Sequence, residues 1–207
     1  MSGLWPFISH DSPAEWEWVS GSPDHPWEVD RGVANAIVAA RLGDIAEYLG
    51  NSSDVKSSNY ETIMNSISSG LGSLSPYREG ELMKSRFQYQ PEWVCVAEVR
   101  GSYELPMILH APSTPNWRGS RLVEALGFGE HAGVLRDWGI RYGAVVYYIG
   151  SSSLVLSIDR PPISKIEAAR VAVEQFSYCE DLLQIVGDPI AVAKCQVPST
   201  QWFFWWD

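Results

Sequence analysis

The hydrophobic pattern of the chain changes character near residue 80. Before that point, apolar residues recur every three or four positions in two segments, residues 32–49 and 59–71. This spacing places them on one face of an α-helix, so the pattern predicts two helices. The apolar faces consist of Val38, Leu42, Ile45 and Leu49 in the first segment, and of Tyr60, Ile63, Ile67 and Leu71 in the second.

Beyond residue 80, short runs of β-branched and aromatic residues predict strands. We expect four of them, at residues 93–99, 105–110, 144–149 and 154–158. The first, WVCVAEV, has the composition of a buried strand, and Pro106 places the second at a sheet edge or a strand start. The connection from Gly150 to Ser153 predicts a hairpin between the last two. The run WFFWW at residues 202–206 predicts a fifth, buried strand, because five consecutive aromatic residues in water would promote aggregation.

Helices are expected between these strands. Residues 121–126 predict a short helical turn, and residues 130–142 a longer helix that ends at Gly143, with an inward face of Leu135, Trp138 and Tyr142. The strongest helix signal begins at Ser164, which has the spacing of a capping box with Glu167. This helix should end near residues 182–185, and its expected inward face is Ile166, Ala169, Val173 and Phe176. Asp188 and Pro189 then predict one more short helix, as its N-cap and first-turn residues.

Together these elements predict an α+β protein in two parts. Residues 70–80, GLGSLSPYREG, contain three glycines, a proline and two serines, a composition typical of a boundary. The first part, residues 1–80, is an acidic Trp-rich arm followed by two helices. The second part, residues 81–207, is expected to hold a mostly antiparallel sheet of four or five strands with helices packed on it.

The first 30 residues have an unusual composition. They contain six acidic residues and four tryptophans but no Lys or Arg, and four prolines forbid a long helix. We expect an extended arm with at most a short strand at residues 16–19. Either its tryptophans pin it to the body while its acids are solvated, or it forms an acidic and aromatic surface that docks a basic partner. The second interpretation assigns partner binding to Asp11, Glu15, Trp16, Glu17, Trp18 and Asp24.

Charge and cysteine usage restrict the function. The net charge of −10 disfavours direct binding to nucleic acids and to anionic membrane surfaces, both of which require cationic side chains. No apolar run approaches the ~20 residues that span a bilayer. Residues 1–10 also lack the basic start of a secretory signal. The three cysteines, Cys95, Cys179 and Cys195, have no zinc-site spacing, so reduced thiols in a cytoplasmic protein are expected.

Short motifs in the second half resemble a known family. The motifs are Val134-Leu-Arg-Asp-Trp138 with Arg141-Tyr-Gly-Ala144, Arg160-Pro-Pro162 followed by Phe176-Ser-Tyr-Cys-Glu-Asp181, and the terminal Trp202-Phe-Phe-Trp-Trp-Asp207, with Trp117-Arg-Gly119 ahead of them. Their order and spacing over residues 93–207 resemble a bacterial family catalogued as domain of unknown function 4253. The resemblance implies a shared fold and a bacterial or phage origin, and no assigned activity.

The motif residues suggest one candidate site with two interpretations. Arginines are permanent cations, so they could form a pocket for a small anionic or polar ligand. The residues of this pocket would be Arg136, Arg141, Arg160, Trp138 and Asp181. Alternatively, Arg160 and Asp181 tie strand ends to a helix through ion pairs.

Two other groups of residues are weaker candidates. Cys179 could act as a nucleophile only beside a base such as His131, and its neighbours Glu180 and Asp181 would raise its pKa, so we expect a packed thiol. His10 with Asp11 and Asp24 with His25 could ligate a metal, but such pairs are common in polar segments, and we expect neither a metal nor another cofactor. With no named catalytic motif in the chain, an enzyme is the less favoured class.

We therefore expect a protein-binding module. An acidic, Trp-rich chain suits an inhibitor or immunity-type partner of a basic protein, such as a nucleic-acid-handling enzyme or a toxin. The alternative is an enzyme or small-ligand binder that uses an Arg-lined pocket around Arg160.

Overall fold

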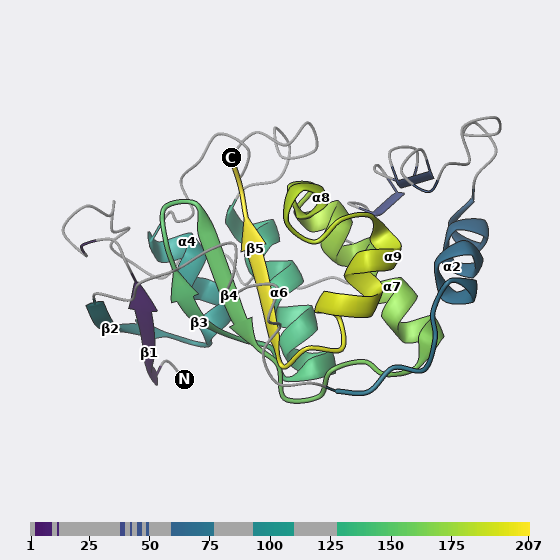
Figure 1. Cartoon of the computed structure of the whole chain (residues 1–207). Helices are drawn as coiled ribbons and strands as arrows, with labels where there is room; N and C mark the ends of the chain where they lie inside the picture. The colour runs from purple at the N-terminus through teal and green to yellow at the C-terminus, as the bar shows by residue number, and fades with distance from the viewer. Residues whose placement is uncertain are drawn as a thin grey trace.

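The computed structural model describes residues 3–9, 12, 38–39, 42, 45–46, 49, 59–76, 93–109 and 128–207. Within them, five strands form one sheet in the order β2-β1-β3-β4-β5 (Figure 1). The strands are β1 (Gly3–Ser9), β2 (Trp93–Val99), β3 (Val145–Ile149), β4 (Ser153–Ser157) and β5 (Gln201–Trp205). All neighbours are antiparallel except β1 and β3, which are parallel. The predicted α+β class with a mostly antiparallel sheet is therefore confirmed.

Strand β1 was not predicted, because the first 30 residues were expected to be an extended arm. It pairs along its whole length with β2, from Gly3 opposite Val99 to Ser9 opposite Trp93. With β3 it shares only the pair of Ile8 and Tyr148. Pro6 has no N–H to donate. The strand tolerates it because the described pairing of β1 with β3 is confined to Ile8, near one end of the strand. The short strand predicted at residues 16–19 lies outside the described residues.

Strand β2 has the predicted bounds, but the prediction that it is buried is wrong. Its side chains alternate, so that Cys95, Ala97 and Val99 are buried whereas Val94 and Val96 are 81% and 54% exposed. The alternation arises because the core packs on only one face of β2, the face that carries Cys95, Ala97 and Val99.

The strand predicted at residues 105–110 is a helix instead. A 3₁₀ turn, η2 (Ser102–Glu104), leads into α4 (Leu105–Leu109). The carboxylate of Glu104 fixes the turn by accepting hydrogen bonds from the backbone N–H of Arg100, at 2.8 Å, and from its guanidinium, at 2.5 Å. Pro106 then falls in the first helical turn, where an N–H is not needed. A short apolar run does not distinguish a strand from a helix, and here the fixed turn decides.

The helix predicted before residue 80 is confirmed as α2 (Tyr60–Ser69). Asn59 caps it by accepting a hydrogen bond of 2.9 Å from the N–H of Thr62. Its face of Ile63 and Ile67 is fully buried. The described residues of the preceding predicted helix also fit, since Val38 and Ile45 are helical and buried. Helix α2 packs against α7 (Lys165–Tyr178) of the second half, and the boundary at residues 70–80 stays a prediction.

Helix α6 (Phe128–Tyr142) ends as the sequence predicts. Leu135, Trp138 and Tyr142 are buried, and the chain leaves the helix at Gly143 with a φ of +66°. A side chain at position 143 would place its Cβ 2.7 Å from the Cβ of Asp159. Glycine is therefore required here by both the left-handed backbone and the close approach. The next segment forms the predicted β3–β4 hairpin, in which the N–H of Gly150 donates to the carbonyl of Ser153 at 2.8 Å.

Helix α7 (Lys165–Tyr178) begins at the predicted cap, where Ser164 accepts a hydrogen bond of 3.2 Å from the N–H of Glu167. Two details of the prediction are wrong. Ile166 is 52% exposed, so the inward face begins at Ala169. The helix also ends at Tyr178, before the expected 182–185, because Cys179 adopts an extended conformation. Further short helical segments follow: α8 (Leu182–Ile185), α9 (Pro189–Ala191) with the predicted Asp188 cap, and the π-helical η3 (Val192–Gln196).

The two faces of the sheet explain the aromatic C-terminus. Trp202 and Phe204 of β5 enter the main core together with Trp138 of α6 and Phe176 of α7. Phe203 points the other way, into a smaller cluster with Tyr148, Val155 and Ile185. Because both faces of β5 are covered, the predicted buried strand is confirmed. None of the helices in the described ranges has the length and apolarity needed to cross a membrane.

Candidate functional site

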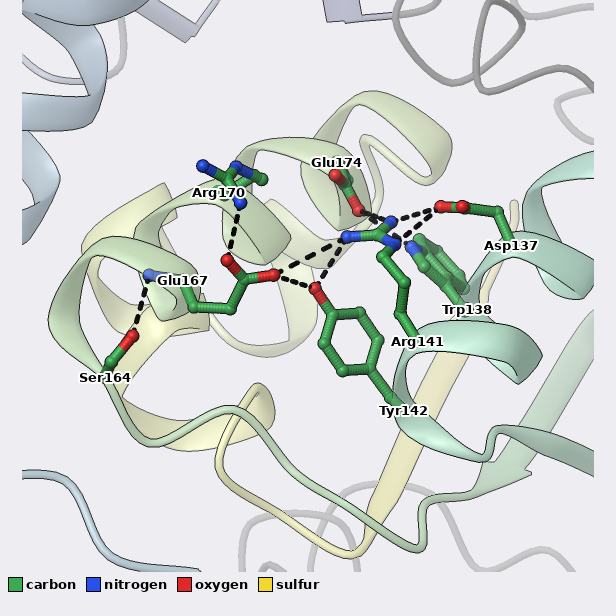
Figure 2. A network of polar contacts seen from close by, with 8 residues as sticks. All are labelled: Asp137, Trp138, Arg141, Tyr142, Ser164, Glu167, Arg170 and Glu174. Carbon is green, nitrogen blue, oxygen red and sulfur yellow. Dashed lines mark hydrogen bonds and ion pairs between the residues drawn. The ribbon is translucent and has the colours of Figure 1, made fainter.

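A network of polar side chains joins α6 to α7 (Figure 2). At its centre is the guanidinium of Arg141, in the last turn of α6. Its Nε donates to Asp137 at 2.8 Å, and one Nη donates to both Asp137 and, at 2.5 Å, Glu174. Glu174 also accepts a hydrogen bond of 2.9 Å from the indole N–H of Trp138. Three residues from one helix and a carboxylate from the other are thus held together.

The second half of the network lies nearer the start of α7. The hydroxyl of Tyr142 accepts a hydrogen bond of 2.6 Å from Arg141 and donates one to Glu167. The other carboxylate oxygen of Glu167 accepts from Arg170 at 2.6 Å. Since Ser164 bonds the backbone N–H of Glu167, the capping serine also fixes the residue that carries this carboxylate.

The charges of the network stabilise one another. Three carboxylates face two guanidinium groups, and Arg141, Asp137 and Glu174 are each 15% exposed or less. Burial opposes the charge of Arg141, but the hydrogen bonds to Glu174 and Asp137 outweigh it and raise the pKa of the guanidinium. Burial, followed by the hydrogen bond to Glu167, raises the pKa of the Tyr142 phenol well above its ordinary 10.

The geometry leaves Arg141 little capacity for a ligand. A guanidinium has five N–H donors. Here the Nε donor, one Nη1 donor and both Nη2 donors point to protein oxygens. The same Nη1 also lies 3.8 Å from a carboxylate oxygen of Glu167, so an anion that binds through two N–H groups would have to displace one of these protein groups. The arrangement therefore acts as an interhelical tie.

The remaining predicted pocket residues bond elsewhere. The guanidinium of Arg136 lies 5.7 Å from the ring centre of Tyr103, and a five-residue separation puts it about 140° around the helix from Arg141. Arg160 is 58% exposed, pairs with Asp159 at 2.9 Å and donates to the carbonyl of Ile140 at 3.3 Å.

Asp181 has other partners again, since it accepts hydrogen bonds of 3.1 Å from the backbone of Asp207 and from the amide of Gln184. Arg160 thus ties the end of the hairpin to α6, and Asp181 ties α8 to the C-terminus, through separate contacts. Among these contacts, only two of the five predicted residues share a partner. Trp138 and Arg141 both donate to Glu174.

Cys179 has the properties of a packed thiol. It is buried, and its S–H donates to the carbonyl of Trp205 at 3.1 Å. Burial raises its pKa far above the ordinary value of 9, so the thiolate that attacks substrates is not formed at neutral pH. No cluster able to hold a metal occurs within the described ranges, and His10, Asp11, Asp24 and His25 lie outside them.

A second feature, which the sequence analysis missed, lies on the outer side of β1 and β2. The register pairs Leu4 with Glu98, Pro6 with Val96 and Ile8 with Val94. Directly opposed residues share one face of a sheet, so these six side chains form one surface, which we name the β1–β2 face. Leu4 is 75% exposed, and Val94 and Val96 are also exposed. The alternation in WVCVAEV is the available signal for an exposed face, but the β-rich composition of the run predicts a buried strand.

A comparison with protein-family models identifies the family of this chain. A family model described as "Domain of unknown function (DUF4253)" matches residues 97–207. The chain belongs to the DUF4253 family. The matched region contains the whole α6–α7 network and strands β3 to β5, whereas β1 and α2 precede it. No curated protein and no solved structure matches the chain.

Several residues of the DUF4253 motifs hold the fold together. Trp138, Arg141 and Tyr142 belong to the α6–α7 network, and Trp202 packs edge-on against Trp138 with ring centres 5.4 Å apart. The residues predicted to bind a partner in the acidic arm lie outside the described residues; they are Asp11, Glu15, Trp16, Glu17, Trp18 and Asp24.

Proposed function

We propose that this DUF4253 protein is a protein-binding module, and that it acts as an inhibitor or immunity-type partner of a basic protein. The observation that carries the proposal is the β1–β2 face. Leu4, Val94 and Val96 are more than half exposed and neighbour one another on two paired strands. Contiguous exposed apolar side chains are typical of protein interaction sites.

The charge of the chain indicates the kind of partner. With a net charge of −10, the protein attracts a positively charged surface and repels another acidic protein. Such attraction raises association rates and depends on salt, whereas apolar contact sets how long the complex persists. In this proposal the acidic charge speeds association with the partner, and the apolar β1–β2 face slows its dissociation.

The direct test is affinity capture with the full chain as bait. We expect a basic protein to be retained by the wild type and to be lost with Val96→Lys, because a cation on the β1–β2 face disrupts apolar contact. Ile163→Lys is the matched control, since Ile163 is 51% exposed and precedes α7. Equal retention by both variants would exclude this face, and capture of only acidic proteins would contradict the proposal.

The acidic arm gives a second, kinetic test. Neutralising Asp11, Glu15, Glu17 and Asp24 to Asn or Gln should slow association with the captured partner and reduce the salt dependence of the association rate. The dissociation rate and the melting temperature should change little. An unchanged association rate at low salt would mean that the arm only packs.

A further inference from the structure

Strand β2 ends the sheet among the described strands (Figure 1). Its seven residues pair with β1 on one side. Along an antiparallel strand, alternate residues direct their backbone N–H and C=O groups to opposite sides. The side of β2 away from β1 therefore presents a row of backbone donors and acceptors in line with the exposed Val94 and Val96.

Among the described residues, β2 carries few of the features that prevent pairing with another chain, and its one charged side chain, Glu98, repels acidic rather than basic segments. Natural edge strands are short, or carry proline, lysine or a bulge. Strand β2 has seven residues, WVCVAEV, without proline or lysine, and its register with β1 is regular throughout. Such an edge can accept an added strand, whose backbone supplies affinity while alternate side chains supply specificity.

We infer that the partner adds an extended, basic segment to the outer edge of β2. This inference rests on the proposed function and specifies how the partner binds. Apolar residues at alternate positions of the added strand continue the β1–β2 face beside Val94 and Val96. Its cationic residues are favoured by the net charge of −10 and by the carboxylate of Glu98, which belongs to the β1–β2 face opposite Leu4.

Charge also argues against a second copy of this chain as the occupant. Two copies would bring together two chains of net charge −10 at the same edge. Like charges oppose association, most strongly at low salt. A basic segment experiences attraction under the same conditions.

The test uses the isotope-labelled full chain and defined peptides. The probe is acetyl-Lys-Val-Thr-Val-Thr-Val-Lys-amide, whose valines lie on one face when extended. One control replaces both lysines by glutamate, and another carries N-methyl groups on alternate residues, which removes hydrogen bonds on one edge. Backbone amide NMR shifts and amide exchange of residues 93–99 are followed during titration, and the Val96→Lys variant is titrated in parallel.

We expect the basic peptide to shift these amides and to slow their exchange. Affinity should fall about tenfold with the acidic peptide at low salt, and about tenfold with Val96→Lys. Equal binding of the N-methylated peptide, or unchanged amides at residues 93–99, would overturn strand addition. Concentration-dependent dimerisation through β2 would overturn it in favour of a second copy. If the captured basic partner is nevertheless lost with Val96→Lys, the proposed function stands and only strand addition fails.

Discussion

The indole N–H of Trp138 and the guanidinium of Arg141 donate hydrogen bonds to the same carboxylate, that of Glu174, at 2.9 and 2.5 Å. One acidic side chain of α7 thereby fixes two side chains of α6. Both helices bury apolar residues in the main core, so the carboxylate fixes how their polar edges meet. Its removal leaves two donors without their partner at a site that is mostly shielded from water.

Replacing Glu174 should destabilise the fold in two steps. Glu174→Gln keeps an oxygen for Trp138 but loses the charge that faces Arg141, and we expect a loss of about 1 kcal/mol in the free energy of unfolding. Glu174→Ala removes both contacts and should cost about 2–3 kcal/mol. Urea unfolding measures both values, and equal stability of the alanine variant would contradict the role assigned to this carboxylate.

The exposed pair of Arg160 and Asp159 provides a contrast. Its side chains are 58% and 72% exposed, at an N–O distance of 2.9 Å. Surface ion pairs contribute about 0–1 kcal/mol, so Asp159→Asn should change the free energy of unfolding by less than about 1 kcal/mol. A loss as large as that of Glu174→Ala would mean that this pair is coupled to the core.

The phenol of Tyr142 should make stability fall at alkaline pH. Its pKa is raised above 10 in the folded chain, by burial and then by the hydrogen bond to Glu167, so the unfolded chain loses this proton first. Unfolding then releases a proton above about pH 10, and the free energy of unfolding decreases as the pH rises. Its stabilisation is fully present below about pH 10.

Tyr142→Phe tests that dependence. The variant should lose about 1–2 kcal/mol at neutral pH, because Arg141 and Glu167 lose the hydroxyl between them. Between about pH 10 and 11 its stability should fall less steeply than that of the wild type. Parallel pH profiles for the two proteins would show that the phenol does not contribute to the linkage.

The C-terminal strand should be essential for folding. Trp202 is fully buried and donates a hydrogen bond of 3.2 Å to the carbonyl of Val197, so Trp202→Ala should cost about 3–5 kcal/mol. Trp205 is only partly buried, and Trp205→Ala should cost less. A chain truncated after Ser199 should not unfold cooperatively, and a truncated protein that melts near the wild-type temperature would contradict the burial of β5 in the core.

The three cysteines should titrate as thiols at different rates. Under denaturing, non-reducing conditions a thiol reagent should count all three, because Cys95, Cys179 and Cys195 are unbridged. In the native protein Cys195, which is partly buried, should react first. Cys179 should react only on unfolding, because it is buried and its pKa is raised. Rapid native modification of Cys179, tested in a Cys195→Ser background, would contradict its packing.

Local signals in the sequence were sufficient for several elements. The helix cap at Ser164, the glycine stop at Gly143 and the hairpin around Gly150 depend on residues a few positions apart, so each was predicted correctly. The apolar face of Ile63 and Ile67 was also evident, because helical spacing is a local property.

The errors share a different cause, since each depends on which distant segment a residue meets. Residues 105–109 form a helix that packs on α6, and the turn before them is tied to β3 through the hydroxyl of Ser102, which accepts a hydrogen bond of 3.0 Å from the N–H of Val146. Strand β2 is exposed on one face because the core covers only the other face of β2 and of its neighbour β1, which is 84 or more residues earlier in the chain (Ser9 to Trp93). A run such as WVCVAEV is compatible with either burial state until its neighbours are known.

The sequence by itself determined that the chain is an acidic α+β protein with a buried aromatic C-terminus, because composition, periodicity and capping act over short distances. Only the tertiary structure decided which polar residues meet. It joins Arg141 to Glu174 across 33 positions and bonds Arg160 and Asp181 to different groups, because contacts between helices and strands are set by packing. It also decided that Val94 and Val96 face outward, since exposure depends on which side of the sheet the core packs.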